Sequence, residues 1–206
     1  KLTVEPATLT ARAENKARSY GDANPPLTIA YTDFVNGETS AVLTELASAT
    51  TTADAASPVA DYVITASGGA AANYQINHVN GLLSVTPINV MVRAENKFRN
   101  YGAADPTFTA TYDGFINGAT KEDLATPVSF TSSATLTSPA ALYTITPSGA
   151  SHGNYTFTYQ NGFLVITAAP LTIAAHNQTK FMGEANPPLT LSYVGFANGE
   201  DESVLS

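Results

Sequence analysis

The 206-residue sequence contains no cysteine and no tryptophan, only nine Lys and Arg residues, and no long apolar run. Without cysteine, the chain forms no disulfide, no thiolate nucleophile and no cysteine-ligated zinc or iron–sulfur site. The net charge of −8 argues against nucleic acid as a partner, because affinity for phosphates depends on Lys and Arg. Insertion of this segment into a membrane is not expected either, because a spanning helix needs ~20 consecutive apolar residues.

What the chain does contain is an internal repeat, together with enough hydrophobic residues (44%) for a packed core. Tyr20-Gly21 recurs as Tyr101-Gly102 and again as Met182-Gly183, at a constant step along the chain. The Phe-x-Asn-Gly motifs that begin at Phe34, Phe115 and Phe196 keep the same step. Repetition of fixed length without insertions indicates tandem copies of one small domain, so the first expected partners are neighbouring repeats.

The period predicts domain boundaries. We expect repeat domains at 7–87 and 88–168, preceded by the tail of an earlier repeat (1–6) and followed by a partial third copy (169–206). Hydrophobic patterning also allows a shifted phase, in which 1–44 is a remnant and 45–125 and 126–206 are complete units. An isolated 88–168 fragment that fails to fold would favour this shifted phase.

The periodicity within each copy is that of β-strands. Residues 9–13 and 90–94 alternate small or apolar side chains with polar ones, which is typical of a half-buried strand. Further strands are expected over four other segments, namely 27–31, 108–112, 62–65 and 143–146. Segments 38–45 and 120–124 are expected to form one or two helical turns, with Thr120 and Asp123 at capping-box spacing. The fold class is therefore mostly β, with a short helical element per copy.

The end of each copy has a hairpin signal. Segments 154–159 and 162–166 alternate on either side of Asn161-Gly162, and the same pattern surrounds Asn80-Gly81. Asn-Gly between two alternating segments favours a two-residue hairpin turn. The two segments are therefore expected to pair with each other.

Several separated motifs together resemble a known family. The sequence Tyr-Gly-Asp-Ala-Asn-Pro-Pro-Leu-Thr at 20–28 is followed by Phe-Val-Asn-Gly at 34–37, Asn73-Tyr74 and a terminal Asn-Gly-Leu-Leu-Ser-Val-Thr at 80–86. In order and spacing these motifs resemble the MBG repeats of the YGX type, which occur in tandem in large bacterial surface and adhesin-like proteins. The resemblance implies an extracellular location, at the bacterial cell surface or secreted, and a small β domain related to β-grasp or mucin-binding modules. It implies no catalytic residues.

One charge pattern stands out against the low number of basic residues. Arg12, Lys16 and Arg18 recur in the second copy as Arg93, Lys97 and Arg99. At alternate positions they are expected to share one face of an extended strand. One interpretation is a solvated sheet face or protected edge, where charges discourage unwanted strand pairing. The other is an anion-binding strip for sulfated or sialylated glycans.

Other candidate residues give weaker signals. The three histidines, His78, His152 and His176, occupy different phases of the repeat and form no pair at metal-ligand spacing. Oxygen ligands for a structural Ca²⁺ would come from Asp22 with Asn24, Glu184 with Asn186, or 200–202, but Ca²⁺ needs six or more. Neither a metal site nor a catalytic site is therefore predicted, and no cofactor is expected, with structural calcium as the alternative.

The aromatic residues divide into repeated and unrepeated positions. Because Met182 replaces Tyr20 and Tyr101 in the third copy, a packing role is expected at that position. A sugar-binding platform would instead use unrepeated aromatics such as Phe98, Phe157 or Tyr159.

Taken together, the sequence predicts a non-enzymatic spacer. The tandem modules are expected to form an elongated rod that serves as the stalk of a bacterial surface protein. The alternative is an adhesin module that recognises a host glycoprotein, mucin or glycan. An enzyme is not expected, because no motif pairs a nucleophile with a base.

Overall fold

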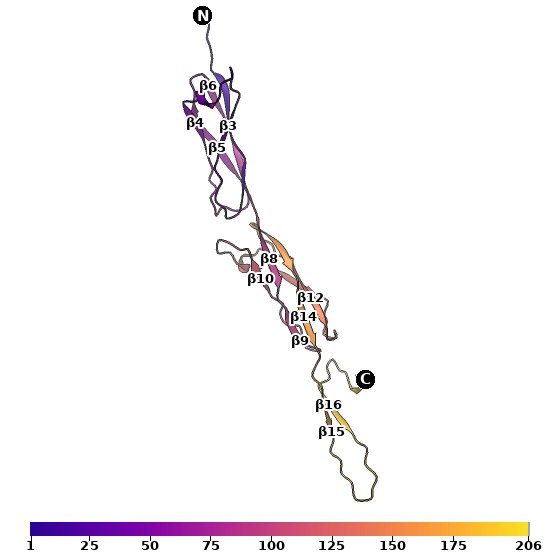
Figure 1. The fold of residues 1–206 in the computed structure, drawn as a ribbon. Helices are drawn as coiled ribbons and strands as arrows, with labels where there is room; N and C mark the ends of the chain where they lie inside the picture. The colour runs from indigo at the N-terminus through magenta and orange to yellow at the C-terminus, as the bar shows by residue number, and fades with distance from the viewer. Residues whose placement is uncertain (206) are drawn as a thin grey trace. The chain divides into compact units, whose positions relative to one another are not determined.

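The computed structural model describes residues 1–205, in which β-strands are almost the only regular secondary structure (Figure 1). The strands of the first copy are β1 (Ala7–Ala13), β2 (Lys16–Ser19), β3 (Ile29–Thr32), β4 (Glu45–Thr50), β5 (Asp61–Ala70), β6 (Tyr74–Val79) and β7 (Gly81–Thr86). Those of the second are β8 (Ile88–Ala94), β9 (Lys97–Asn100), β10 (Ala110–Asp113), β11 (Ser129–Ser132), β12 (Leu142–Ser148), β13 (Tyr155–Gln160) and β14 (Gly162–Thr167). The third contributes β15 (Thr172–Ala175) and β16 (Leu191–Val194). The mostly-β prediction is confirmed.

Each of the first two copies contains two sheets with the same topology. In the first copy, a three-stranded sheet has the order β3-β1-β6 and a four-stranded sheet the order β2-β7-β5-β4. The second copy repeats these as β10-β8-β13 and β11-β12-β14-β9. Of the five strand pairs in the first copy, three are antiparallel, whereas β1 with β6 and β2 with β7 are parallel. The third copy has one antiparallel pair, β15 with β16.

The two sheets of a copy share one core. Alternation along β1 buries Leu9, Ala11 and Ala13, as the sequence pattern predicts. Ala13 at the end of β1 packs against Ile64 of β5 and Leu83 of β7, which belong to the other sheet. In the second copy Ala94 packs in the same way against Ile145 and Leu164. Burial of these apolar faces against each other is what holds the two sheets together.

The chain crosses from one sheet to the other at two adjacent points. The first crossing is Glu14-Asn15, between β1 and β2, where the Asn15 side-chain oxygen accepts a hydrogen bond from the Leu82 N–H (2.9 Å). The second is Asn80-Gly81, between β6 and β7, where the Asn80 side chain accepts from the Ala66 N–H (3.2 Å). At these points, where strand pairing stops, the asparagine side chains thus accept hydrogen bonds from backbone N–H groups.

The hairpin prediction is wrong. Strand β13 belongs to the sheet of β8, whereas β14 pairs with β12 and β9, so the two segments around Asn161-Gly162 do not pair with each other. The glycine serves a close approach instead of a turn. A Cβ on Gly81 would lie 2.5 Å from the Ala13 carbonyl oxygen, and one on Gly162 would lie 2.6 Å from that of Ala94. Only glycine fits where the two crossings touch.

The helical element is a single 3₁₀ turn in each copy. The three turns are η1 (Ser40–Val42), η2 (Lys121–Asp123) and η3 (Glu202–Val204). The capping box predicted at Thr120 and Asp123 is present, with the Asp123 carboxylate accepting from the Thr120 N–H (2.8 Å). Only Ser40–Val42 of the predicted helical segment 38–45 is helical, and Glu45 already belongs to β4.

The chain divides into two compact units that cut across the repeat. The first comprises Lys1–Val90, Gly114–Pro127 and Ala150–Phe157, and the second comprises Met91–Asp113, Val128–Gly149 and the chain from Thr158 onward. Each junction between copies therefore lies inside one unit. None of the helical turns in residues 1–205 is long or apolar enough to cross a membrane.

The close approach at Gly162 gives a stability prediction. Gly162→Ala should lower the free energy of unfolding by about 2 kcal/mol, because the new methyl group overlaps the Ala94 carbonyl in a packed core. Gly153→Ala is the matched control, since a Cβ there meets no atom within 4 Å and its φ is not positive. Urea unfolding of both variants provides the measurement, and equal stability of the two would contradict the crossing geometry.

Candidate functional site

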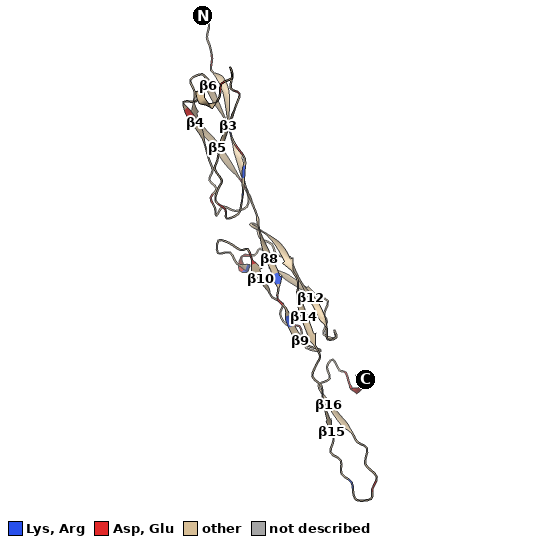
Figure 2. Cartoon of the chain, in the orientation of Figure 1, with Lys and Arg blue, Asp and Glu red and all other residues tan. Residues whose placement is uncertain are grey.

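The six basic residues of the predicted strip do not share one strand face. Arg12 lies on β1 in the three-stranded sheet, whereas Lys16 and Arg18 lie on β2 in the four-stranded sheet. In the second copy, Arg93 on β8 is separated in the same way from Lys97 and Arg99 on β9 (Figure 2). The single-strand prediction is wrong because the chain changes sheets between the first and second basic residue of each set.

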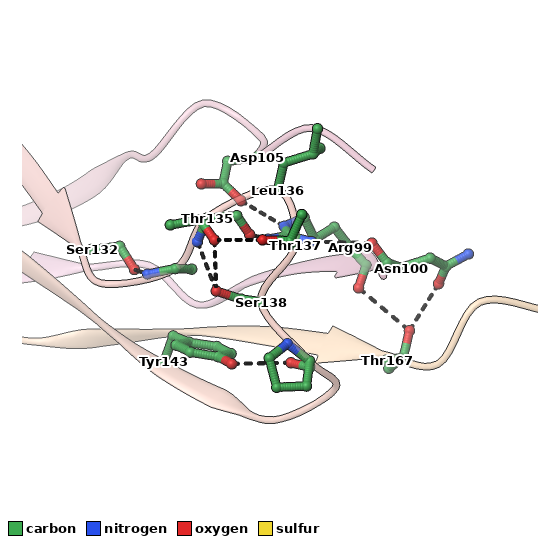
Figure 3. A network of polar contacts seen from close by, with 12 residues as sticks. Arg99, Asn100, Asp105, Ser132, Thr135, Leu136, Thr137, Ser138, Tyr143 and Thr167 are labelled. Atoms are coloured by element: carbon green, nitrogen blue, oxygen red, sulfur yellow. Dashed lines mark hydrogen bonds and ion pairs between the residues drawn. The ribbon is translucent and has the colours of Figure 1, made fainter. Parts of the chain in front are cut away.

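Arg99 is an internal structural residue. Its side chain is only 2% exposed, and its Nε donates to the Asp105 carboxylate at 2.6 Å (Figure 3). Its Nη2 donates to the Thr135 carbonyl (2.6 Å) and its Nη1 to that of Asn100 (3.3 Å). The guanidinium thereby ties β9 to two loops, with each of its three nitrogens engaged. This burial and full pairing leave it no face for a ligand.

Arg18 occupies the equivalent place in the first copy with a neutral partner. Its Nε donates to the Asn24 side-chain oxygen (2.8 Å), and its Nη1 donates to the Ser19 carbonyl (3.0 Å). Its Nη2 reaches the Asp54 carbonyl, while the Asn24 amide donates to the Ala53 carbonyl (2.6 Å). Asn24 was considered above as a calcium-loop position, but its side-chain oxygen accepts from Arg18, as the carboxylate of Asp105, its equivalent in the second copy, accepts from Arg99.

The remaining basic residues lie nearer the solvent, and three of them pair with carboxylates. Lys16 contacts Glu14 (3.1 Å) and Lys97 contacts Glu95 (3.0 Å). Arg93 lies 3.5 Å from the Asp113 carboxylate and donates to the Gln160 side chain (3.0 Å). Arg12 is exposed on β1. Exposed pairs of this kind contribute little to stability and leave the cations accessible to solvent.

The carboxylates in these pairs have altered acidity. A hydrogen bond from the Thr109 hydroxyl, followed by the hydrogen bond and charge of Lys97, lowers the pKa of Glu95 below its ordinary value. Thr28 and Lys16 lower the pKa of Glu14 in the same way. In each set the glutamate of the first crossing joins a lysine on the next strand, β2 or β9, to the threonine just before β3 or β10.

The unrepeated aromatic residues lie on different sheets. Phe98 is 67% exposed on β9, whereas Phe157 and Tyr159 lie on β13. Since β9 and β13 belong to different sheets, the structure does not gather these three rings into one platform.

The histidines and acidic clusters show no common centre. His78 Nε2 lies 2.7 Å from the Gly68 carbonyl oxygen, and His152 Nδ1 accepts from the Asn154 N–H (3.0 Å). His176 donates its backbone N–H to the Thr190 carbonyl. Residues 1–205 contain no cluster of three or more His, Asp or Glu side chains placed to hold a metal ion. Asp201, in the acidic 200–202 segment, accepts instead from the Ser203 N–H (2.9 Å).

One recurring interaction was missed at the sequence level. The Tyr155 hydroxyl accepts from the Ile116 N–H (3.3 Å) and donates to its carbonyl (3.1 Å). In the first copy the Tyr74 hydroxyl accepts from the Val35 N–H (3.1 Å). A buried tyrosine thus fixes the Phe-x-Asn-Gly loop in both complete copies. The identical spacing between loop and tyrosine was the available signal.

The Arg99 network predicts a large stability difference between basic residues of the same strip. Arg99→Leu should destabilise the fold by about 3 kcal/mol, because it leaves the Asp105 carboxylate and the Thr135 carbonyl without their donor. Arg93→Ser should change the stability by less than about 0.5 kcal/mol, because Arg93 is exposed. Thermal unfolding of the two variants tests this, and a similar cost for both would refute the structural role of Arg99.

The Glu95 interactions predict a titration behaviour. Removing the hydroxyl in Thr109→Val should raise the pKa of Glu95 toward its ordinary value, since that hydrogen bond is its main cause of lowering. A lowered folded-state pKa stabilises the fold above the ordinary carboxyl pKa, and this contribution disappears as the pH falls through the lowered value. Carboxyl NMR titration of the parent and the variant measures the shift. Glu14 serves as the internal control and should not move.

Comparison with known proteins agrees with the repeat seen in sequence and structure. The family model of the MBG domain (YGX type) matches residues 9–84, 90–165 and 171–206. No curated protein and no solved structure matches the chain. The three matches cover most of the sequence. They agree in phase with the strand pairing, because strands pair only within 7–86, within 88–167 and within 172–194 in the described residues. The chain therefore belongs to the MBG domain family of the YGX type, which it matches twice over equal lengths and a third time over a shorter one.

Proposed function

We propose that this chain is a non-enzymatic spacer segment of a bacterial adhesin-like protein that is displayed on the cell surface or secreted. The observation that carries the proposal is the link between the first two copies. Strand β7 ends at Thr86 and β8 begins at Ile88, so Pro87 alone separates the last strand of one copy from the first strand of the next. A one-residue proline link restricts relative motion far more than a flexible Gly/Ser tether does.

The repetition of the framework supports the same role. The sheet order, the crossing glycines, the buried arginine and the tyrosine-held loop all recur in both complete copies. These recurring features hold the fold together. The MBG family is a non-catalytic repeat domain, which supports the non-enzymatic part of the proposal.

The alternative function, recognition of a host glycan, mucin or glycoprotein, has less support. Of the six residues in the predicted anion-binding strip, Arg18 and Arg99 are buried and hydrogen-bonded. The other four are divided between two sheets of each copy. Glycan binding by Arg12, Lys16, Arg93 and Lys97 stays a prediction, and it would have to use these two faces separately.

Small-angle scattering of the whole chain tests the spacer role. A single compact particle of this length would have a radius of gyration of about 17 Å. We expect a value well above this, because each added repeat domain extends the particle by roughly its own diameter of ~30 Å. A radius of gyration near that of one compact particle would contradict a spacer.

A binding screen against mucin and sulfated or sialylated glycans separates the two functions. The spacer proposal predicts no binding by the whole chain. Binding that is lost when Arg93 and Lys97 are both replaced by Ser, in a variant that unfolds at the parent temperature, would establish the ligand-binding alternative instead.

A further inference from the structure

The Tyr-Gly turn, Tyr20-Gly21 and its equivalents, lies where the chain leaves each copy. The parallel pairing of β2 with β7 sets Ser19 beside Thr86, and the Tyr20 N–H donates to the Thr86 carbonyl (2.8 Å). In the second copy, the Tyr101 N–H donates to the Thr167 carbonyl (2.8 Å). Because Thr86 immediately precedes Pro87, the topology brings the turn to the start of the next copy.

The turn contacts the Phe-x-Asn-Gly loop of the following copy at both junctions. A Cβ on Gly21 would overlap the Ile116 side chain and lie 3.8 Å from the Asn117 amide nitrogen. A Cβ on Gly102 would lie 2.5 Å from the Ala197 Cβ and 3.7 Å from the Asn198 amide nitrogen. The same two repeat positions thus meet at each junction, at a distance that leaves no room for a Cβ unless the receiving side chain moves.

The third copy acts as an internal control. Gly183 has the same left-handed backbone, with φ of 89° against 86° at Gly21 and 78° at Gly102. A Cβ on Gly183 would meet no atom within 4 Å, and the Met182 side chain is fully exposed. The crowding at Gly21 and Gly102 therefore comes from the following copy and not from the turn itself. Tyr101 packs against the core of its own copy, as expected, and Tyr20 in addition contacts the Tyr155 ring of the next copy.

The receiving surface is held in place by contacts within its own copy. The Tyr155 hydroxyl holds both backbone groups of Ile116, and the Tyr155 ring packs edge-on against Phe115 (5.1 Å between centroids). The Tyr155 ring also contacts the Tyr20 ring, edge-on at 5.8 Å between centroids. A preformed surface loses little conformational freedom when a partner docks on it.

Each junction adds polar contacts of its own. In the first, the Val59 N–H donates to the Asn154 side-chain oxygen (3.0 Å). In the second, the Tyr101 hydroxyl donates to the Glu200 carboxylate (2.6 Å). The contact between turn and loop is thus the shared part of the junction, and the polar contacts vary around it.

In the first copy, no Tyr-Gly turn among residues 1–205 contacts the Phe-x-Asn-Gly loop at 34–37. The Tyr74 hydroxyl holds Val35, and Tyr74 packs edge-on against Phe34 (5.8 Å). A recess of about 380 Å³ opens beside Val35, Asn36 and Asn73. Asn36 and Asn73 are the repeat equivalents of Asn117 and Asn154, which line the recess that Tyr20 borders on the second copy. The open recess thus shares these two repeat positions with the recess that Tyr20 lines one repeat further on.

We propose that the Tyr-Gly turn and the Phe-x-Asn-Gly loop form a docking joint between successive repeats, and that the free loop at Val35-Asn36 receives the Tyr-Gly turn of a further copy of this repeat. The joint holds adjacent repeats in one orientation beyond what the proline link imposes. This inference goes beyond the proposed spacer role and does not depend on it, because an array of ligand-binding modules would use the same joint.

Pulsed dipolar EPR on the whole chain tests the joint. The parent has no cysteine, so Thr65→Cys and Thr146→Cys place one spin label on an exposed strand position of each complete copy. We expect a narrow distance distribution in this labelled parent. Gly21→Val should broaden it at least twofold, because the larger side chain cannot approach Ile116. Gly183→Val introduces the same backbone strain without a neighbour and should leave the distribution unchanged.

A second variant covers the case in which Gly21→Val unfolds the first copy. Ile116→Asp removes the apolar partner without straining the turn, and it should broaden the distribution while the circular dichroism spectrum stays that of the parent. A parent distribution as broad as that of Ile116→Asp would overturn the joint, and so would an unchanged distribution in a folded Gly21→Val variant.

Docking at the free loop is tested with a longer chain, in which one further copy of residues 7–87 replaces residues 1–6 and so directly precedes Ala7. Spin labels at Thr65 and at the matching threonine of the added copy should give a narrow distribution. Replacing the glycine of the added Tyr-Gly turn with Val should broaden it. Equal widths with and without that replacement would show that the Val35-Asn36 loop does not receive the turn, whatever the outcome at the existing junction.

Discussion

The fold of each repeat depends on one close approach, in which the second crossing between sheets passes directly over the first. Gly81 lies against the Ala13 carbonyl and Gly162 lies against that of Ala94, at distances that exclude any side chain. Because both crossings occur at the same level, β1 and β6 run parallel in one sheet while β2 and β7 run parallel in the other. The core of Ala13, Ile64 and Leu83 fills the space on the buried side of these crossings. A side chain at the glycine would push the two sheets apart at the point where they share this core.

The same parallel pairs determine what lies at the two ends of a repeat. The β1–β6 pair places Tyr74 beside Ala7, where the chain enters, and the β2–β7 pair places Ser19 beside Thr86, where the chain leaves. The loop held by the tyrosine is therefore at the entry and the Tyr-Gly turn is at the exit. With only Pro87 between β7 and β8, the exit of one copy necessarily meets the entry of the next. The topology thus places the Tyr-Gly turn at the exit of a repeat and the Phe-x-Asn-Gly loop at its entry, where the two meet at a junction.

The repeat period, the mostly-β class and the alternation of strands such as β1 could be predicted from the sequence, because each depends on local patterns of side chains. The partners of those strands could not. Asn161-Gly162 has the composition of a hairpin turn, but the glycine is required by the Ala94 carbonyl, a contact that is distant in sequence. Arg93 and Arg99 likewise look equivalent in the sequence, and only the change of sheet between them makes one exposed and the other buried. Local patterns indicate that a strand exists, whereas tertiary contacts decide what it pairs with.

In the proposed joint, adjacent repeats are held together by a specific contact and are not merely linked. The most direct measurement is backbone ¹⁵N NMR relaxation of the whole chain. We expect residues 7–87 and 88–168 to share one anisotropic rotational diffusion tensor. Two separate correlation times, each that of an independent domain of about 80 residues, would contradict it.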